Sequence, residues 1–211
     1  KEYSLKEALE LATKTSITKF DATVELHINL NVDPRQADQN IRDSLVLPSG
    51  TGKNIRVAVL AETDDATKAK KAGADIVGNE DLLKKIEKGV IEFDTLVATP
   101  NLMASLGKYA RVLGPKGLMP NPKSGTVTTD VAKAVEQAKA GRVEYRVDST
   151  GIVHLGVGKV SFGADKLLAN AQAVFASIKT NKPNSLKGNY VKTITISSTM
   201  GPGIKVIISE I

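Results

Sequence analysis

The chain has 211 residues, a formal net charge of +6 and no cysteine. This length suits one large domain or two small ones, and the lack of cysteine excludes disulfides and thiol chemistry. No apolar run approaches the ~20 residues that cross a membrane, so we expect no membrane partner, and the positive charge favours a polyanionic one.

The first 50 residues combine a capped helix with a half-buried strand. Ser4-x-x-Glu7 is a capping-box pattern, which predicts that a helix follows it. Apolar and polar residues alternate strictly over 20–30, with Phe20 on the apolar face. This alternation predicts a strand with one buried and one available face. A second, short strand is expected over 44–47.

From residue 51 the pattern changes to nearly continuous apolar strands that alternate with helices. Strands are predicted over 55–60, 75–78 and 95–98, and helices over 63–72, 81–88, near 103 and over 129–139. Apolar strands joined by helices are typical of a parallel sheet that is covered on both faces. We therefore expect a parallel α/β domain here.

The segment Gly114–Lys123 is the most distinctive part of this block. It holds three prolines, two glycines and the lysines Lys116 and Lys123. Proline fixes φ and removes a backbone donor, so the segment is predicted to be neither helix nor central strand. It lies in an acid-free stretch over 95–129. This favours a basic loop that faces an anion, and a solvated connection is the alternative.

After Gly141 the half-exposed pattern returns. The sequence predicts strands over 143–147 and 152–157 in a hairpin turned at 148–151, a helix over 164–179, and strands over 191–197 and 204–209. Since this style occurs at both ends, we predict a discontinuous domain of residues 1–50 and 143–211. The domain of residues 51–142 would be inserted into it, through two glycine-containing connections that can act as a hinge.

The carboxyl end is basic over a long span. No acidic residue occurs over 166–209, whereas the span holds Lys166, Lys179, Lys182, Lys187, Lys192 and Lys205. A phosphate-facing surface and a plain solvated face both remain open. The segment Ser198–Gly203 lies between the last two predicted strands. Its local sequence favours a simple hairpin connection, although its glycines and the Thr199 hydroxyl suit close approach to a ligand.

Motifs for catalysis and for cofactor binding are incomplete. The segment Gly50–Lys53 lacks two residues of a phosphate-binding loop, because Leu47 and Asn54 stand where that motif has glycine and Ser or Thr. His27 and His154 are the only histidines, and no cysteine is present to complete a zinc site. We therefore expect no catalytic residue, no metal and no cofactor.

Six segments, in order and at matching spacing, carry a resemblance to a known family. They are Lys19–Glu25, Asp38–Arg42, Gly114–Lys123, Gly151–His154, Gly156–Lys159 and Thr199–Pro202. Together they resemble the bacterial-type L-one family of large-subunit ribosomal proteins, the family of the mobile stalk beside the exit tRNA site. The resemblance spans essentially the whole chain, and the proline-rich loop and the Thr-Met-Gly-Pro run are its most specific parts.

The resemblance implies an α/β fold of two domains. One is a split α+β domain with an antiparallel sheet, residues 1–50 and 143–211, which binds RNA. The other is an inserted Rossmann-like parallel α/β domain, residues 51–142. Carried onto matching positions, the RNA-binding residues are Lys19, Phe20, Thr23, Glu25, Asp148, Thr150, Gly151, His154, Lys159, Thr199, Met200, Gly201 and Pro202.

Two further features follow from the resemblance. Lys116 and Lys123 would form a secondary basic loop that contacts ribosomal RNA or tRNA. Ser149 departs from the family pattern, since many relatives carry lysine there, and the phosphate contact of that lysine is left open. The implied contacts are mostly neutral or acidic, which suits recognition of RNA shape and 2′-hydroxyls more than phosphate neutralisation.

The function implied by the resemblance is structural rather than enzymatic. The protein would bind stalk ribosomal RNA of the large subunit, assist release of deacylated tRNA from the exit site, and repress its own operon by binding its mRNA. Its partners would be this RNA, exit-site tRNA and its own mRNA, with a monomer outside the ribosome. Ribosomes of the cytoplasm are expected, and organelle ribosomes are the alternative. Two other classes stay open: an enzyme with a nucleotide at the edge of the inserted sheet, and an RNA chaperone without site preference.

Overall fold

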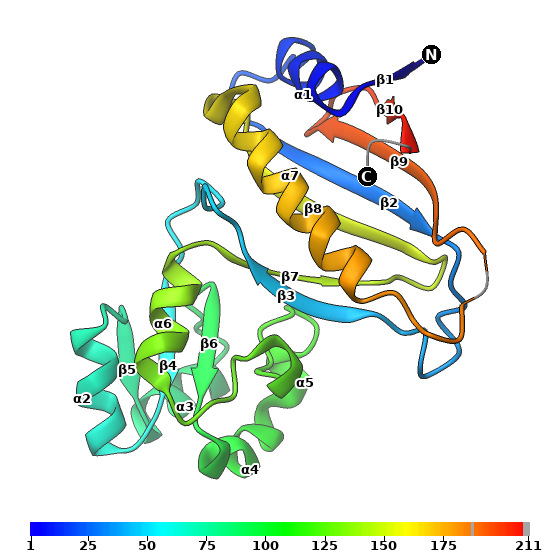
Figure 1. Cartoon of the computed structure of the whole chain (residues 1–211). Helices are drawn as coiled ribbons and strands as arrows, with labels where there is room; N and C mark the ends of the chain where they lie inside the picture. Colours follow the sequence, from blue (N-terminus) through cyan, green and yellow to red (C-terminus); the bar gives the residue numbers. More distant parts are fainter. Residues whose placement is uncertain (187, 209–211) are drawn as a thin grey trace. The chain divides into compact units, whose positions relative to one another are not determined.

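The structure is a computed structural model that describes residues 1–186 and 188–208, except for the side chains of Thr63, Glu80 and Lys123. The chain divides into two compact units, Lys1–Gly52 with Gly141–Ile211, and Lys53–Ala140. Figure 1 shows that the middle of the chain forms the second unit, while both ends of the chain meet in the first. The predicted α/β class is confirmed, with an antiparallel sheet in the first unit and a parallel sheet in the second.

The first unit holds a five-stranded sheet and a separate pair of strands. Its elements are β1 (Glu2–Tyr3), α1 (Leu5–Lys14), β2 (Thr23–Leu30), β3 (Arg42–Val46), β7 (Arg142–Arg146), β8 (Ile152–Lys159), α7 (Gly163–Thr180), β9 (Val191–Ser198) and β10 (Ile204–Val206). The large sheet has the order β1-β10-β9-β2-β8, and β3 pairs with β7. Pairing is antiparallel except between β1 and β10.

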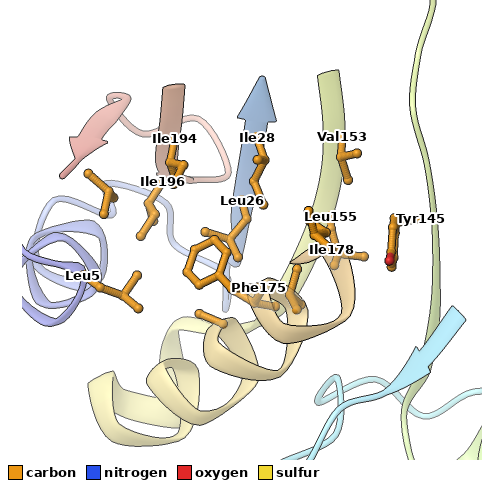
Figure 2. Close-up of a cluster of buried hydrophobic side chains, with 14 of the residues drawn as sticks. Leu5, Leu26, Ile28, Tyr145, Val153, Leu155, Phe175, Ile178, Ile194 and Ile196 are labelled. Atoms are coloured by element: carbon orange, nitrogen blue, oxygen red, sulfur yellow. The ribbon is translucent and has the colours of Figure 1, made fainter. Parts of the chain in front are cut away.

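One face of the five-stranded sheet is buried against α1 and α7. Every second residue of β2 from Val24 to Leu30 is buried, and the residues between them are half-buried. In Figure 2, Leu26 and Ile28 lie on the same side of the sheet as Phe175 and Ile178 of α7. Burial of each such side chain is worth roughly 1.5–3 kcal/mol, which fixes the apolar face inward and leaves the polar face outward.

The predicted capping box at the start of α1 is confirmed. The backbone N–H of Glu7 donates to Ser4 Oγ at 3.3 Å, and the backbone N–H of Ser4 donates to Glu7 Oε2 at 3.2 Å. Both donors would otherwise lack an intrahelical partner. The cap therefore sets the first residue of a helix that packs Leu5, Leu9 and Ala12 into the core.

The second unit is a parallel sheet with helices on both faces, as the sequence predicts. Its elements are β4 (Val57–Leu60), α2 (Thr63–Lys71), β5 (Ile76–Gly78), α3 (Glu80–Glu87), β6 (Thr95–Ala98), α4 (Met103–Leu106), α5 (Ala110–Leu113) and α6 (Val131–Lys139). The strand order is β5-β4-β6. Val57 and Val59 of β4 pack with α2 and α6, whereas Leu60 packs with α3, α4 and α5.

The alternation predicts Phe20 on the buried face of the first long strand, but the structure does not place it there. The strand β2 begins at Thr23, and Phe20 is 60% exposed. The chain before the strand is tied to the end of β8 instead, because Asp21 accepts hydrogen bonds from the backbone and hydroxyl of Ser161 at 3.0 and 2.7 Å. Ala22 is still buried, but the strand begins three residues later than the alternation predicts.

The predicted hairpin of 143–147 with 152–157 forms only at its turn. Strand β7 pairs along its whole length with β3, and only the bridge from Val147 to Val153 joins it to β8. Tyr145 of β7 is buried in the first core, and its hydroxyl lies 2.8 Å from the hydroxyl of Ser177 on α7. This anchoring to α7 accounts for the departure of β7 from the five-stranded sheet.

Smaller differences concern loops and chain ends. The short strand β1 and the helix α5 are not predicted by the sequence, and the last strand ends at Val206. Ser209 and Lys187 lie outside the described residues. Within the proline-rich loop, Pro122–Ser124 forms one 3-10 turn. Proline is compatible with the first position of a helical turn, where no backbone donor is needed.

Candidate nucleic-acid interface

The outward face of the five-stranded sheet is polar. Its side chains come from three neighbouring strands, namely Thr23, Glu25, His27 and Asn29 of β2, His154 of β8, and Thr193, Thr195 and Ser197 of β9. The helices α1 and α7 both pack on the opposite face. We call the face with these eight residues the open face. It presents hydroxyl, imidazole and carboxylate groups rather than a dense array of lysines.

At the start of β2, three predicted site residues are joined by hydrogen bonds. The ammonium group of Lys159 donates to the carbonyl oxygen of Asp21 at 3.0 Å and to Thr23 Oγ1 at 3.3 Å. The backbone N–H of Thr23 donates to Thr199 Oγ1 at 3.2 Å. Lys159, Thr23 and Thr199 therefore form one cluster, although they come from β8, β2 and the turn after β9.

The turn after β9 presents Met200 to solvent. Met200 is 80% exposed and has φ 63°, the only positive φ of a non-glycine residue in the described chain. The backbone N–H of Gly201 donates to the carbonyl oxygen of Ser198 at 2.7 Å, which closes a four-residue turn with Met200 at its third position. This position of a type II turn normally takes glycine, so a methionine there is strained by ~1–2 kcal/mol.

Glycine is required at position 201 because this part of the turn passes very close to Ser198. A Cβ at this position would lie 2.2 Å from Ser198 Oγ and 3.1 Å from the Ser198 carbonyl oxygen. Ser198 itself is buried, and its hydroxyl has no hydrogen-bond partner among the described residues. The space next to Ser198 therefore selects glycine at 201, even though the backbone there has an ordinary φ.

At the far end of β2, the carboxylate of Asp148 organises the turn into β8. It accepts hydrogen bonds from the backbone N–H groups of Thr150 and Ile152, each at 2.8 Å, and from the Thr150 hydroxyl at 2.7 Å. These bonds, the one from Ile152 first, lower the pKa of Asp148 to about 2. Gly151 adopts φ 82°, and its carbonyl oxygen accepts the backbone N–H of Leu30 at 2.9 Å.

In the middle of the open face, two histidines touch across the β2–β8 pair. His27 Nδ1 and His154 Nδ1 are 2.9 Å apart, and His27 Nε2 lies 3.0 Å from Ser197 Oγ. His154 Nε2 lies 3.5 Å from Asp148 Oδ2, and His27 Nε2 lies 3.9 Å from Glu25 Oε2. Burial first, and then the neighbouring His154, lower the pKa of His27, and Glu25 opposes them.

The sequence-predicted residues fall into two groups at the ends of β2. Lys159, Thr23 and Thr199 gather at its start, and Asp148 with Gly151 at its end, about 20 Å away by the rise of an extended strand. Glu25 and His154 occupy the face between them. Lys19 and Phe20 are exposed in the bend before β2, and Gly201 and Pro202 follow Met200 in the turn.

The secondary basic loop belongs to the second unit. Lys116 is exposed there, and the side chain of Lys123 lies outside the described residues. The residues of the open face all belong to the first unit, whereas both lysines belong to the second. The role of this loop stays a prediction.

Five residues of the open face were missed as candidates, namely His27, Asn29, Thr193, Thr195 and Ser197. The alternation of 20–30 already placed His27 on the polar side of the strand. In the sequence, however, it is considered only as a zinc ligand, and that role is rejected. Ser197 had no signal of its own, because its place beside His27 depends on the register of β9 against β2. Cross-strand register between distant segments is not encoded in local periodicity.

The carboxyl edge of the parallel sheet carries a small hollow. Its volume is about 480 Å³, and Ala61, Glu62, Ala66, Gly78 and Asn79 line it. Of the described residues that line it, Glu62 is the only charged one, and its carboxylate disfavours the phosphates of a nucleotide. Among the described residues, no group of three or more His, Cys, Asp or Glu is placed to hold a metal ion. Over residues 1–186 and 188–208, no helix combines the length and apolar character of a membrane span.

Comparison with known proteins gives consistent matches over nearly the full length. A family model described as "Ribosomal protein L1p/L10e family" matches residues 11–202. The large ribosomal subunit protein uL1 of Lactobacillus johnsonii is 57% identical over 202 residues, which cover 96% of this chain and 88% of the relative. The protein of the same name from Lactobacillus gasseri is 56% identical with the same coverage.

Proposed function

Because the chain belongs to the ribosomal protein L1p/L10e family, a family of structural proteins rather than enzymes, we propose that it is a constituent of the large ribosomal subunit. It binds the stalk of the large-subunit ribosomal RNA through the open face and the turns at its two ends. The relatives named above are proteins of that subunit. The observation that carries the RNA-binding proposal is the hydrogen-bonded cluster of Lys159, Thr23 and Thr199 beside the exposed Met200.

The chemistry of this surface suits recognition of RNA shape and sugars. Glu25 and the hydroxyls of Thr193, Thr195 and Ser197 can accept or donate hydrogen bonds to 2′-hydroxyls. Met200 offers an apolar surface to a sugar or base. Asp148 differs from the other residues of the proposed site, because its carboxylate already accepts hydrogen bonds from three donors within its own turn. Its role is to hold the turn in shape.

Further parts of the proposal rest on the resemblance to the family. Movement of the stalk would help release deacylated tRNA from the exit site, and the same surface would bind an RNA of similar shape in the protein's own mRNA and repress its operon. The protein would act on cytoplasmic or organelle ribosomes and be a monomer away from them. Lys116 and Lys123 would make secondary contacts with ribosomal RNA or tRNA.

The test is binding of the full chain to the stalk segment of the Lactobacillus johnsonii large-subunit ribosomal RNA. A scrambled RNA of equal length is the control, and both are titrated at several salt concentrations. We expect the stalk RNA to bind at least ~10³-fold more tightly, the lower end for specific recognition of a nucleic acid. Equal affinity for both RNAs would instead identify an RNA chaperone without site preference.

The enzyme alternative has its own measurement. A nucleotide that bound at the edge of the parallel sheet would raise the melting temperature of the free protein, since a ligand that binds only the folded state stabilises it. We expect ATP and GTP to leave the melting temperature unchanged, because Glu62 lines the hollow at that edge.

A further inference from the structure

Four side chains form a continuous chain of polar contacts across the open face. Ser197 Oγ lies 3.0 Å from His27 Nε2, His27 Nδ1 lies 2.9 Å from His154 Nδ1, and His154 Nε2 lies 3.5 Å from Asp148 Oδ2. This series of contacts crosses β9, β2, β8 and the turn before β8. It spans the centre of the surface that we assign to RNA.

The chemistry of its ends dictates where the protons lie in the neutral state. The carboxylate of Asp148 only accepts, so the hydrogen of His154 is on Nε2 and points toward it. His154 Nδ1 then carries a lone pair and accepts from His27 Nδ1–H at 2.9 Å. His27 Nε2 is left as an acceptor for the Ser197 hydroxyl at 3.0 Å. Each contact has one donor and one acceptor in this arrangement.

This series of contacts can take up one additional proton and no more. A proton can enter at His27 Nε2 if the Ser197 hydroxyl turns and accepts, and Glu25 Oε2 at 3.9 Å then faces the new charge. A proton at His154 Nδ1 would place two hydrogens between ring nitrogens only 2.9 Å apart. The contact between the rings therefore limits the histidine pair to a single positive charge.

The charged groups around the pair come from β2, β8, β10 and the turn before β8. Glu25 on β2 and Asp148 before β8 favour the added proton, whereas Lys159 at the end of β8 and Lys205 of β10, opposite Thr195, oppose it. In the free protein, burial of His27 and its contact with His154 hold its pKa below the ordinary value. The free protein therefore disfavours a positive charge on His27, and an anion placed near the pair would oppose that effect.

We propose that His27 and His154 form a proton-accepting RNA contact, which takes up one proton from solvent when stalk RNA binds to the open face. This inference rests on the proposed function. A phosphate close to the pair stabilises the charged state of the histidines. The proton from solvent is the only species taken up, and no covalent bond forms or breaks in the RNA. The turned Ser197 hydroxyl is then free to donate to the RNA, so that one protonation event supplies both a charge and a hydrogen-bond donor.

The experiment uses the full chain and the Lactobacillus johnsonii stalk RNA at constant ionic strength. Calorimetric titration at pH 6.5 in buffers of different ionisation enthalpy gives the number of protons taken up. We expect an uptake approaching one proton, and an affinity that rises by up to tenfold per pH unit as pH falls from 7.5 to 6. The variant His27→Gln, which cannot titrate but keeps a donor and an acceptor, should show neither effect.

The possible results separate this inference from the proposed function. Tight, specific binding without proton uptake would overturn the inference and leave the function intact, whereas loss of all specific binding would overturn the function itself. An uptake that persists in His27→Gln would also overturn the inference, because the proton would then enter the RNA or another group. If the variant does not fold, proton NMR titration of the two histidines in the wild-type chain, free and RNA-bound, gives the answer. We expect one of them to become charged at a higher pH in the complex, and no shift would contradict the inference.

Discussion

Thr23 and Thr199 hold one another across the start of the open face. The backbone N–H of Thr23 donates to Thr199 Oγ1 at 3.2 Å, and the backbone N–H of Thr199 donates to the carbonyl oxygen of Thr23 at 2.9 Å. These residues lie 176 positions apart in the chain. The contact fixes the turn that carries Met200 against the strand that carries Glu25 and His27.

Replacement of Thr199 by alanine should weaken binding of the stalk RNA by about 1–3 kcal/mol, the range for a specific nucleic-acid contact. The hydroxyl that orients the turn would be lost, and Thr23 N–H would lose an acceptor. Thr199→Ser keeps the hydroxyl and should bind nearly as the wild type. Fluorescence anisotropy with labelled RNA gives both affinities, and equal binding by Thr199→Ala and the wild type would remove this residue from the site.

Met200→Gly should stabilise the first unit while it weakens RNA binding. Glycine adopts φ near +63° without strain, so we expect a gain of about 0.5–1 kcal/mol in the free energy of unfolding, after allowance for the greater freedom of glycine when unfolded. The loss of the exposed side chain should weaken RNA binding by about 1–3 kcal/mol. Urea denaturation and RNA titration of the same samples provide the two numbers.

Two control variants make the Met200 result specific. Met200→Ala removes the side chain but retains the strained φ, so it should weaken RNA binding without stabilising the fold. Val90→Ala removes an exposed apolar side chain from the second unit and should leave RNA binding unchanged. A Met200→Gly protein that binds RNA as well as the wild type would remove the Met200 side chain from the proposed RNA contact.

Gly201→Ala should destabilise the turn, and Ser198→Ala should partly restore it. The added Cβ would approach Ser198 Oγ to 2.2 Å, which forces the serine to move or the turn to open. We expect a loss of about 1–3 kcal/mol, the usual cost of overpacking. Ser198→Ala alone removes a buried hydroxyl that has no partner in the described part of the chain, and it should be neutral or slightly stabilising. A double-mutant cycle by urea denaturation checks this, and strictly additive effects would contradict the predicted clash.

Asp148→Asn should destabilise the first unit at pH 7 and have progressively less effect in acid. The pKa of Asp148 is lowered to about 2 in the folded chain from an ordinary value of 3.8, so its carboxylate contributes stability that is complete above about pH 5. That contribution is lost as the pH falls through about 2. Denaturation of both proteins at pH 7, 4 and 2.5 tests the trend, which should be a shrinking difference, and a constant difference would argue against it.

Excision of the middle of the chain should leave a folded RNA-binding unit. A Cβ at Gly141 would lie 2.6 Å from the Cα of Gly50, so the two ends of the first unit meet and a direct connection needs few residues. A chain in which residues 53–140 are replaced by two glycines should retain most of the stalk-RNA affinity of the full chain. If it folds by circular dichroism but binds weakly, the second unit makes more of the contact than we propose.

Local pattern and tertiary context contributed differently to these results. The alternation over 20–30 correctly assigned Val24 to Leu30 to the core, because burial of one strand face requires a period of two. The same alternation misplaced Phe20, whose segment is held by the contact of Asp21 with Ser161, 140 residues later. The turn of Ser198–Gly203 looked like an ordinary connection, and its strain at Met200 became visible only in the backbone.

The sequence by itself determined the α/β class, the faces of the strands, the capped first helix and the resemblance to the family. All of these depend on local periodicity or on short motifs. Only the tertiary structure placed His27 beside His154 and Ser197, which lie 127 and 170 positions away. That arrangement follows from the register of hydrogen bonds between strands, which is set by packing of the whole sheet on α1 and α7. A one-residue shift of β8 or β9 would turn His154 or Ser197 into the core and separate the groups that share a proton.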